Sequence, residues 1–178
     1  MLDESNSQIV EVKLIDFGSA FKFDSEMNVN ATTPEYLAPE MLTFLNALTK
    51  SKEPKSTMSS KLKEMCQPWS FDVWALGVII IEIITGFPIW LSAKSKMMTV
   101  QKKPKVGAGV FGVKGRDLPK ILNAQTNFMK GMNLNIKKLD NYLIYKGNTD
   151  LINLLESMMN VDPAKRISPK EITEHPFC

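Results

Sequence analysis

The chain has 178 residues, of which 44% are hydrophobic and 23% charged, and its formal net charge is +3. This composition is typical of one globular domain or a large piece of one, and the charge is too small to indicate a nucleic-acid or membrane surface. Two cysteines and one histidine exclude a disulfide framework and a histidine-based zinc site. We therefore expect an intracellular protein, in the cytoplasm, that binds neither nucleic acid nor a membrane.

A short β-strand is expected near the start of the chain. Residues 9–15 alternate in polarity and are rich in β-branched side chains, which predicts a strand. This strand leads directly into Asp16, Phe17 and Gly18. A carboxylate at a strand end is well placed to hold a hard cation such as Mg²⁺, and glycine lets the backbone turn. Taken alone, the three residues favour an ordinary strand-to-loop turn.

The longest apolar run covers residues 69–86, and Glu82 is its only ionisable side chain after position 72. A helix that is apolar on every side lies in a protein core or in a membrane. A membrane span needs about 18 consecutive apolar residues, and this run, extended to Leu91, reaches that length only by including Asp72, Glu82 and Pro88. We therefore predict a buried central helix over about 71–86.

The rest of the chain is expected to be mostly helical, with two insert-like regions. The first, about 43–68, contains a lysine- and serine-rich stretch that predicts a solvated loop, followed by a short helix. The second, about 92–140, is expected to contain a short helix that opens at Leu118. Final helices are expected over about 149–177. Their predicted caps are Thr149 and Ser168.

Two short motifs delimit the segment 16–40. Asp-Phe-Gly opens it, and Ala-Pro-Glu closes it, with Glu40 lying 24 positions after Asp16. In this respect the sequence resembles a eukaryotic protein kinase, where these two motifs bracket the activation segment. The Thr-Pro-Glu-Tyr sequence at residues 33–36 is similar to the docking loop of the serine/threonine type.

Three further features occur in the order that kinases have them. The apolar run resembles the central helix of the kinase lower lobe, with its Asp-x-Trp start at Asp72 and Trp74. Asp-Pro-Ala-Lys-Arg at 162–166 and His-Pro-Phe at 175–177 resemble the closing motifs. Motifs in the correct order are far more specific than any one alone. The resemblance implies a mostly α-helical, kinase-like C-terminal lobe, so that residues 1–178 form a partial kinase domain.

The resemblance also implies roles for individual residues. Asp16 would coordinate the Mg²⁺ that bridges the ATP phosphates, Phe17 would pack into the interior, and Gly18 would complete this cofactor-binding motif. Glu82 is expected either beside a basic side chain of the substrate or in a structural pair. The positions implied for the activation segment and for substrate docking are Ser25, Thr32, Thr33, Pro34, Glu35 and Glu82.

Other residues are implied to hold the lobe together. Glu40 would pair with Arg166 and tie the activation segment to the lower lobe. Asp72 would hold the backbone of the catalytic loop from the central helix, whose start also contains Trp74. Ile79 and Ile83, four positions apart on one face, would support the hydrophobic column beneath the nucleotide.

Several kinase parts are missing from the sequence. Neither a glycine-rich loop, nor the ATP-binding lysine, nor the His-Arg-Asp catalytic loop precedes Asp16. A glycine-rich match at 107–113 follows the central helix and a lysine-rich stretch, so we interpret it as a loop in an insert.

We accordingly expect a family function of ATP-dependent phosphoryl transfer to serine or threonine of proteins, with ATP and Mg²⁺ as cofactors. The chain alone is expected to be inactive and to bind neither cofactor tightly. It would then be a fragment that needs its upper lobe. The alternatives are a truncated pseudokinase that binds a partner protein as a scaffold, and a structural component of a larger assembly.

Overall fold

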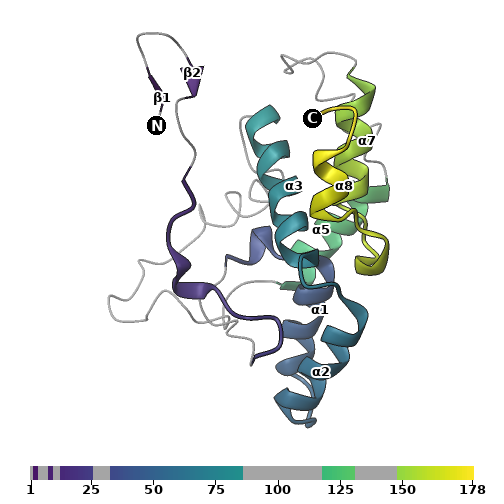
Figure 1. The fold of residues 1–178 in the computed structure, drawn as a ribbon. Coiled ribbons are helices and arrows are strands. Elements are labelled where there is room, and N and C mark those ends of the chain that lie inside the picture. The colour runs from purple at the N-terminus through teal and green to yellow at the C-terminus, as the bar shows by residue number, and fades with distance from the viewer. Residues whose placement is uncertain (1, 4–7, 10–12, 26–32, 86–117, 131–147) are drawn as a thin grey trace, which may run out of the picture.

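The computed structural model describes residues 2–3, 8–9, 13–25, 33–85, 118–130 and 148–178. Helices dominate this part of the chain (Figure 1). They are α1 (Pro39–Leu48), α2 (Lys55–Met65), α3 (Ser70–Thr85), α5 (Leu118–Lys130), α7 (Thr149–Met158) and α8 (Pro169–Thr173). Short 3₁₀ helices are η1 (Phe17–Ser19), η2 (Pro34–Tyr36) and η3 (Pro163–Lys165). The prediction of a mostly helical fold is confirmed.

The strand predicted over 9–15 is not confirmed. Two short antiparallel strands, β1 (Leu2–Asp3) and β2 (Gln8–Ile9), pair with Leu2 opposite Ile9. Residues 13–15 have no regular structure, and residues 10–12 lie outside the described part. Within that part no strand pairs with residues 13–15, and a lone strand has no partner for its backbone groups.

One hydrophobic cluster lies between α3 and α7, with contributions from α5 and from Ala38. Along α7 the apolar side chains recur at helical spacing, so one face of the helix is buried. The buried members from the two main helices are Val73, Trp74, Val78, Ile81, Leu151, Leu154, Leu155, Met158 and Met159. Gly77 permits close contact here, because a Cβ at this position would lie 2.7 Å from Met159 Cγ.

A second hydrophobic cluster lies where α1, α2 and the start of α5 meet. Its buried members are Met41, Leu42, Phe44, Leu45, Leu62, Cys66 and Leu118. Phe21 and Phe23, which precede α1 in the chain, pack against the outside of this cluster. The two predicted insert-like regions therefore contribute helices to a core, α2 from the first and α5 from the second. The parts of the second region at 92–117 and 131–140 lie outside the described residues.

The prediction that the central helix is buried is correct for one side of α3 only. Leu76, Ile79 and Ile83 are 44%, 42% and 75% exposed, and they form one apolar stripe, which we call the α3 stripe. The reason is that α7 and α5 cover the opposite side, while no described element packs over this one.

No single helix in the described part is long and apolar enough to cross a membrane. The helices α2 and α3 reach the required length and composition only as a pair, and the axis bends by 72° between them.

The predicted caps of the final helices are half correct. Asn148, and not Thr149, caps α7, since its side chain accepts a hydrogen bond from the Leu151 N–H at 3.0 Å. Ser168 caps α8 as predicted: its Oγ accepts from the Glu171 N–H, and Glu171 Oε2 accepts from the Ser168 N–H. This reciprocal pair is a capping box.

Candidate functional site

Asp16 has an unusual backbone conformation for a residue other than glycine, with φ 62° and ψ 70°. Aspartate adopts this left-handed region more readily than most residues do, and such conformations are concentrated at functional sites. The Asp16 carboxylate folds back, and its Oδ1 accepts a hydrogen bond from the Gly18 N–H at 3.3 Å. A Cβ on residue 18 would lie 3.2 Å from this oxygen, so glycine there leaves room for the carboxylate.

The Asp16 side chain can offer one oxygen to a metal ion. It is exposed, and its Oδ2 has no polar partner among the described residues. No group of three or more histidine, cysteine or acidic residues gathers in the described part of the chain. A single oriented carboxylate suits Mg²⁺, which commonly takes one or two carboxylates and completes its shell with water and phosphate oxygens.

The expectation that Phe17 packs into the interior is wrong. Phe17 is 69% exposed, and the preceding Leu14 and Ile15 are each 83% exposed. In Figure 1 this purple stretch of chain runs outside the helical body. Since none of the described helices covers residues 13–18, their apolar side chains lie open to solvent.

The predicted docking residues differ in accessibility. Thr33 and Ser25 are exposed, whereas Pro34 and Glu35 are buried, and Glu35 is only 1% exposed. Thr32 lies outside the described residues. Of this set, therefore, Thr33 and Ser25 can be reached by another protein without rearrangement of η2.

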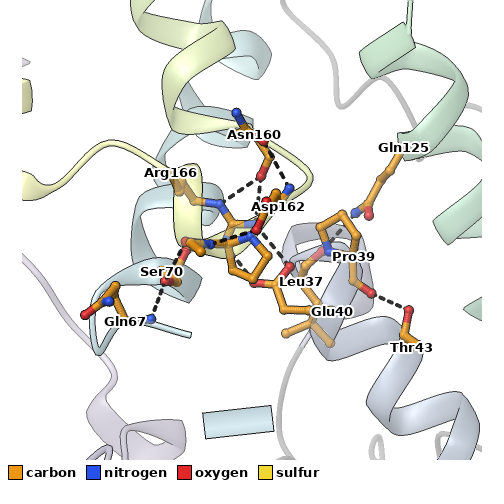
Figure 2. Close-up of polar contacts among 12 residues, drawn as sticks. Leu37, Pro39, Glu40, Thr43, Gln67, Ser70, Gln125, Asn160, Asp162 and Arg166 are labelled. Carbon is orange, nitrogen blue, oxygen red and sulfur yellow. Dashed lines mark hydrogen bonds and ion pairs between the residues drawn. The ribbon is translucent and has the colours of Figure 1, made fainter. Parts of the chain in front are cut away.

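Glu82 forms a structural pair, the second of the two arrangements expected for it. The Tyr36 hydroxyl donates a hydrogen bond to Glu82 Oε2 at 2.6 Å. This bond raises the pKa of Tyr36 to about 12, with smaller contributions from burial and from the nearby carboxylates. Gln125 of α5 donates from Nε2 to the Leu37 carbonyl at 2.9 Å (Figure 2), so the chain around η2 is held from both α3 and α5.

Arg166 and Glu40 form a two-pronged ion pair across 126 positions of sequence (Figure 2). Arg166 Nη1 lies 2.7 Å from Glu40 Oε1, and Nη2 lies 3.0 Å from Oε2. Nη1 also donates to the Ser70 carbonyl at 2.7 Å, while Nε and Nη2 donate to the Asn160 carbonyl at 3.1 and 2.9 Å. All five N–H donors of the guanidinium therefore have an acceptor.

The ion pair is fully enclosed. The side chains of Arg166 and Glu40 are 0% and 5% exposed, and the guanidinium lies over the Trp74 ring at 5.2 Å. A cation over an indole face is an attractive arrangement. The pair thus connects the start of α1, the start of α3 and the loop after α7.

Sequence reasoning did not identify the other partners in these networks. Ser70 and Asn160 accept hydrogen bonds from Arg166 through their backbone carbonyls. Every residue has such a carbonyl, so no side-chain pattern in the sequence indicates these partners. Tyr36 could have been noticed, because a partly buried tyrosine hydroxyl usually has a hydrogen-bond partner.

Asp72, Ile79 and Ile83 lie on the open face of α3, whereas Trp74, which was also predicted, is fully buried. Asp72 is exposed and has no polar partner among the described residues, and partial burial raises its pKa. Leu76, Ile79 and Ile83 follow it at helical spacing, so Asp72 marks one end of the α3 stripe.

The family model described as "Protein kinase domain" matches residues 1–178. The chain belongs to the protein kinase family. This confirms the resemblance inferred from the motifs, and it agrees with the pairing of Glu40 and Arg166, which lie in two of these motifs, 126 positions apart in the sequence.

Curated relatives of this kinase-family chain include two mitogen-activated protein kinases. The chain is 27% identical to mitogen-activated protein kinase pmk-1 of Caenorhabditis elegans over 173 residues, which cover 94% of this chain and 38% of the relative. It is 26% identical to mitogen-activated protein kinase 12 of Homo sapiens over 171 residues, which cover 94% of this chain and 40% of the relative.

A third relative is dual specificity protein kinase CLK1 of Homo sapiens, 25% identical over 188 residues, with coverage of 94% and 32%. The chain thus spans about two fifths or less of the length of these relatives. No solved structure matches it.

Proposed function

We propose that this chain supplies the lower-lobe part of a serine/threonine protein kinase. In this role Asp16 is the Mg²⁺ ligand, and the exposed Thr33 belongs to the surface on which a protein substrate docks. The observation that supports the proposal most directly is the buried pair of Glu40 and Arg166, because it fixes one end of the segment 16–40 to the helical body. The other end has an exposed carboxylate held in a defined orientation by Gly18.

The residues present fit such a role chemically. Bound Mg²⁺ would neutralise charge on the ATP phosphates. Asp16 contributes one oxygen ligand, and its backbone conformation and the Gly18 N–H orient that oxygen. Thr33 lies exposed beside η2, which Tyr36 and Leu37 connect to α3 and α5, so a docked substrate would meet a fixed surface.

The chain alone should not transfer phosphate. Its one histidine, His175, is followed by Pro176, so the 178 residues contain no His-Arg-Asp catalytic loop. Without a catalytic base or an ATP-binding lysine, Asp16 has no other groups with which to position a nucleotide.

A chimera tests the proposal. The part of mitogen-activated protein kinase 12 that precedes its Asp-Phe-Gly motif is joined to this chain, and phosphate transfer from labelled ATP to a generic protein substrate is measured. We expect transfer by the chimera, loss of roughly a hundredfold or more in its Asp16→Asn variant, and none by the chain alone. Circular dichroism verifies that both chimeras fold. Transfer that is equal in the folded Asp16→Asn chimera would contradict the proposal.

The α3 stripe favours a second candidate, a truncated pseudokinase that serves as a binding module. Three large apolar side chains in one row on the surface are typical of a face that another protein covers. If this is its role, Ile83→Lys should abolish binding to a partner without lowering the free energy of unfolding, because Ile83 is 75% exposed. Binding that is unaffected by this substitution would exclude the α3 stripe as the binding face.

A further inference from the structure

The chain after Gly18 forms a compact turn at residues 22–25. The Ser25 N–H donates to the Lys22 carbonyl at 2.9 Å, and the Ser25 hydroxyl donates to the same carbonyl at 2.8 Å. The Ser25 carbonyl accepts a hydrogen bond at 2.5 Å from Lys63 Nζ, which lies 38 positions later on α2.

An aromatic contact holds the same turn at its other side. The Phe23 ring lies 6.4 Å from the Phe71 ring, at an interplanar angle of 38°. Phe21 joins Phe23 in packing against the hydrophobic cluster formed by α1, α2 and the start of α5. Residues 21–25 are therefore attached to the helical body by one charged hydrogen bond and two aromatic side chains.

We propose that α2 acts as an internal clamp on the segment that follows Asp16-Phe17-Gly18. Lys63 of α2 holds the turn at Ser25, while Phe71 of α3 and the cluster shared by α1, α2 and α5 hold Phe23. The loop that bears Asp16 is therefore tethered at residues 21–25, a few residues after Gly18. Tethering the loop would also help to position Asp16 for Mg²⁺. That effect rests on the proposed function of Asp16, whereas the clamp itself does not. In this account the helix in the predicted insert 43–68 is a positioning element for the activation segment.

The clamp predicts a specific effect on amide hydrogen exchange in the whole chain. Lys63→Ala removes the donor to the Ser25 carbonyl, so exchange of the Ser25 amide should become faster by on the order of tenfold, the effect of losing one hydrogen bond from a charged donor. Lys63→Arg keeps a charged donor and should restore most of the protection. The Met58 amide, hydrogen-bonded to the Pro54 carbonyl, reports whether α2 itself remains folded.

A matched control is available on the same helix. Lys61 pairs with Glu53 at 3.1 Å, is 62% exposed and does not contact the turn, so Lys61→Ala should leave exchange at Ser25 unchanged. If Lys63→Ala also exposes the Met58 amide, Phe23→Ala decides, since it removes the aromatic anchor and should accelerate exchange at Ser25 as well. If α2 stays folded in Lys63→Ala and exchange at Ser25 is unchanged, the clamp is overturned. If α2 unfolds in Lys63→Ala, unchanged exchange at Ser25 in Phe23→Ala overturns it.

A second measurement separates the clamp from the proposed metal role. Mn²⁺, used as a paramagnetic substitute for Mg²⁺, should broaden the Gly18 amide signal, and Lys63→Ala should raise the Mn²⁺ concentration needed severalfold. If wild-type Gly18 is not broadened, the assignment of Asp16 as a ligand fails, while exchange at Ser25 still decides the clamp. If wild-type Gly18 is broadened and Lys63→Ala is identical to it, the clamp does not position the Asp16 loop.

Discussion

Arg166 uses every donor of its guanidinium within the protein, on Glu40, Ser70 and Asn160. Such a group is a structural connector and has no donor left for a ligand. A buried ion pair adds little net stability by itself, but removal of one partner leaves an uncompensated buried charge. Glu40 and Arg166 are therefore structurally important because the loss of either one would leave the other as an unpaired buried charge.

Replacement of Glu40 by alanine tests this argument. Glu40→Ala should lower the free energy of unfolding by about 3–5 kcal/mol, because the Arg166 charge would remain buried without its carboxylate. Urea unfolding measures the loss. Lys170→Ala is the control, since the Lys170–Glu174 pair is exposed and should change stability by less than about 1 kcal/mol. A loss in Glu40→Ala no larger than in this control would contradict the argument.

Tyr36 gives the protein a predictable response to alkaline pH. Its pKa is about 12 in the folded chain, above the ordinary value of 10.0, so the folded state holds the proton more tightly than the unfolded state. The contribution of this hydroxyl to stability is fully present below pH 10 and is lost as pH rises from about 10 to about 12. Unfolding in urea across this range should show a smaller decline for Tyr36→Phe than for the wild type. Parallel declines would argue against the bond to Glu82.

The two thiols should differ strongly in reactivity. Burial raises the pKa of Cys66 to about 12, with a further increase from Glu40, whereas Cys178 is exposed. Because the thiolate is the reactive form, a thiol reagent at mildly alkaline pH should modify Cys178 rapidly and Cys66 only upon unfolding. Cys178→Ser should eliminate the rapid phase. A rapid phase that persists in this variant would show that Cys66 is accessible.

At the scale of elements, the sequence predicted the presence of the helices better than it predicted which other elements pack against them. The apolar run of α3 and the cap of α8 at Ser168 follow from local patterns. The open side of α3 and the absence of a strand over 13–15 could not be predicted from local patterns. Burial and strand pairing depend on neighbouring elements that a local pattern does not specify. Similarly, composition predicted a solvated lysine- and serine-rich stretch within the first insert, but not the contact of Lys63 with the Ser25 carbonyl.

The packing of α3 on α7 depends on Gly77. Alanine is the better helix former by up to about 1 kcal/mol, yet a Cβ here would lie 2.7 Å from Cγ of the fully buried Met159. We expect Gly77→Ala to destabilise the chain by about 1–3 kcal/mol, the usual range for an overpacked core. Thermal or urea unfolding measures it.

A double variant identifies the cause. If the clash with Met159 Cγ is responsible, Met159→Ala should reduce the loss caused by Gly77→Ala, since the alanine side chain ends at Cβ and has no Cγ to meet the new methyl group. Additive losses in the double variant, or a stabilising Gly77→Ala, would show that the two helices are not in close contact at this point.

At the scale of the whole molecule, two hydrophobic clusters and one buried ion pair connect motifs that lie far apart in the sequence. The order of these motifs was sufficient to predict the family, and the resemblance to that family implied the pairing of Glu40 with Arg166. It was insufficient to predict that Phe17 and the α3 stripe are exposed, because those side chains need covering elements that the described part does not contain.

The central claim is that Asp16 is the metal ligand of a kinase-type activation segment, and one measurement tests it most directly. Mn²⁺ is titrated into the whole chain while the Gly18 amide is followed by nuclear magnetic resonance, in wild type, in Asp16→Asn and in Asp24→Asn, which alters an exposed carboxylate on the same segment. We expect broadening at Gly18 in wild type and Asp24→Asn, and none in Asp16→Asn. Equal broadening in all three chains, or broadening elsewhere that leaves Gly18 sharp, would contradict it.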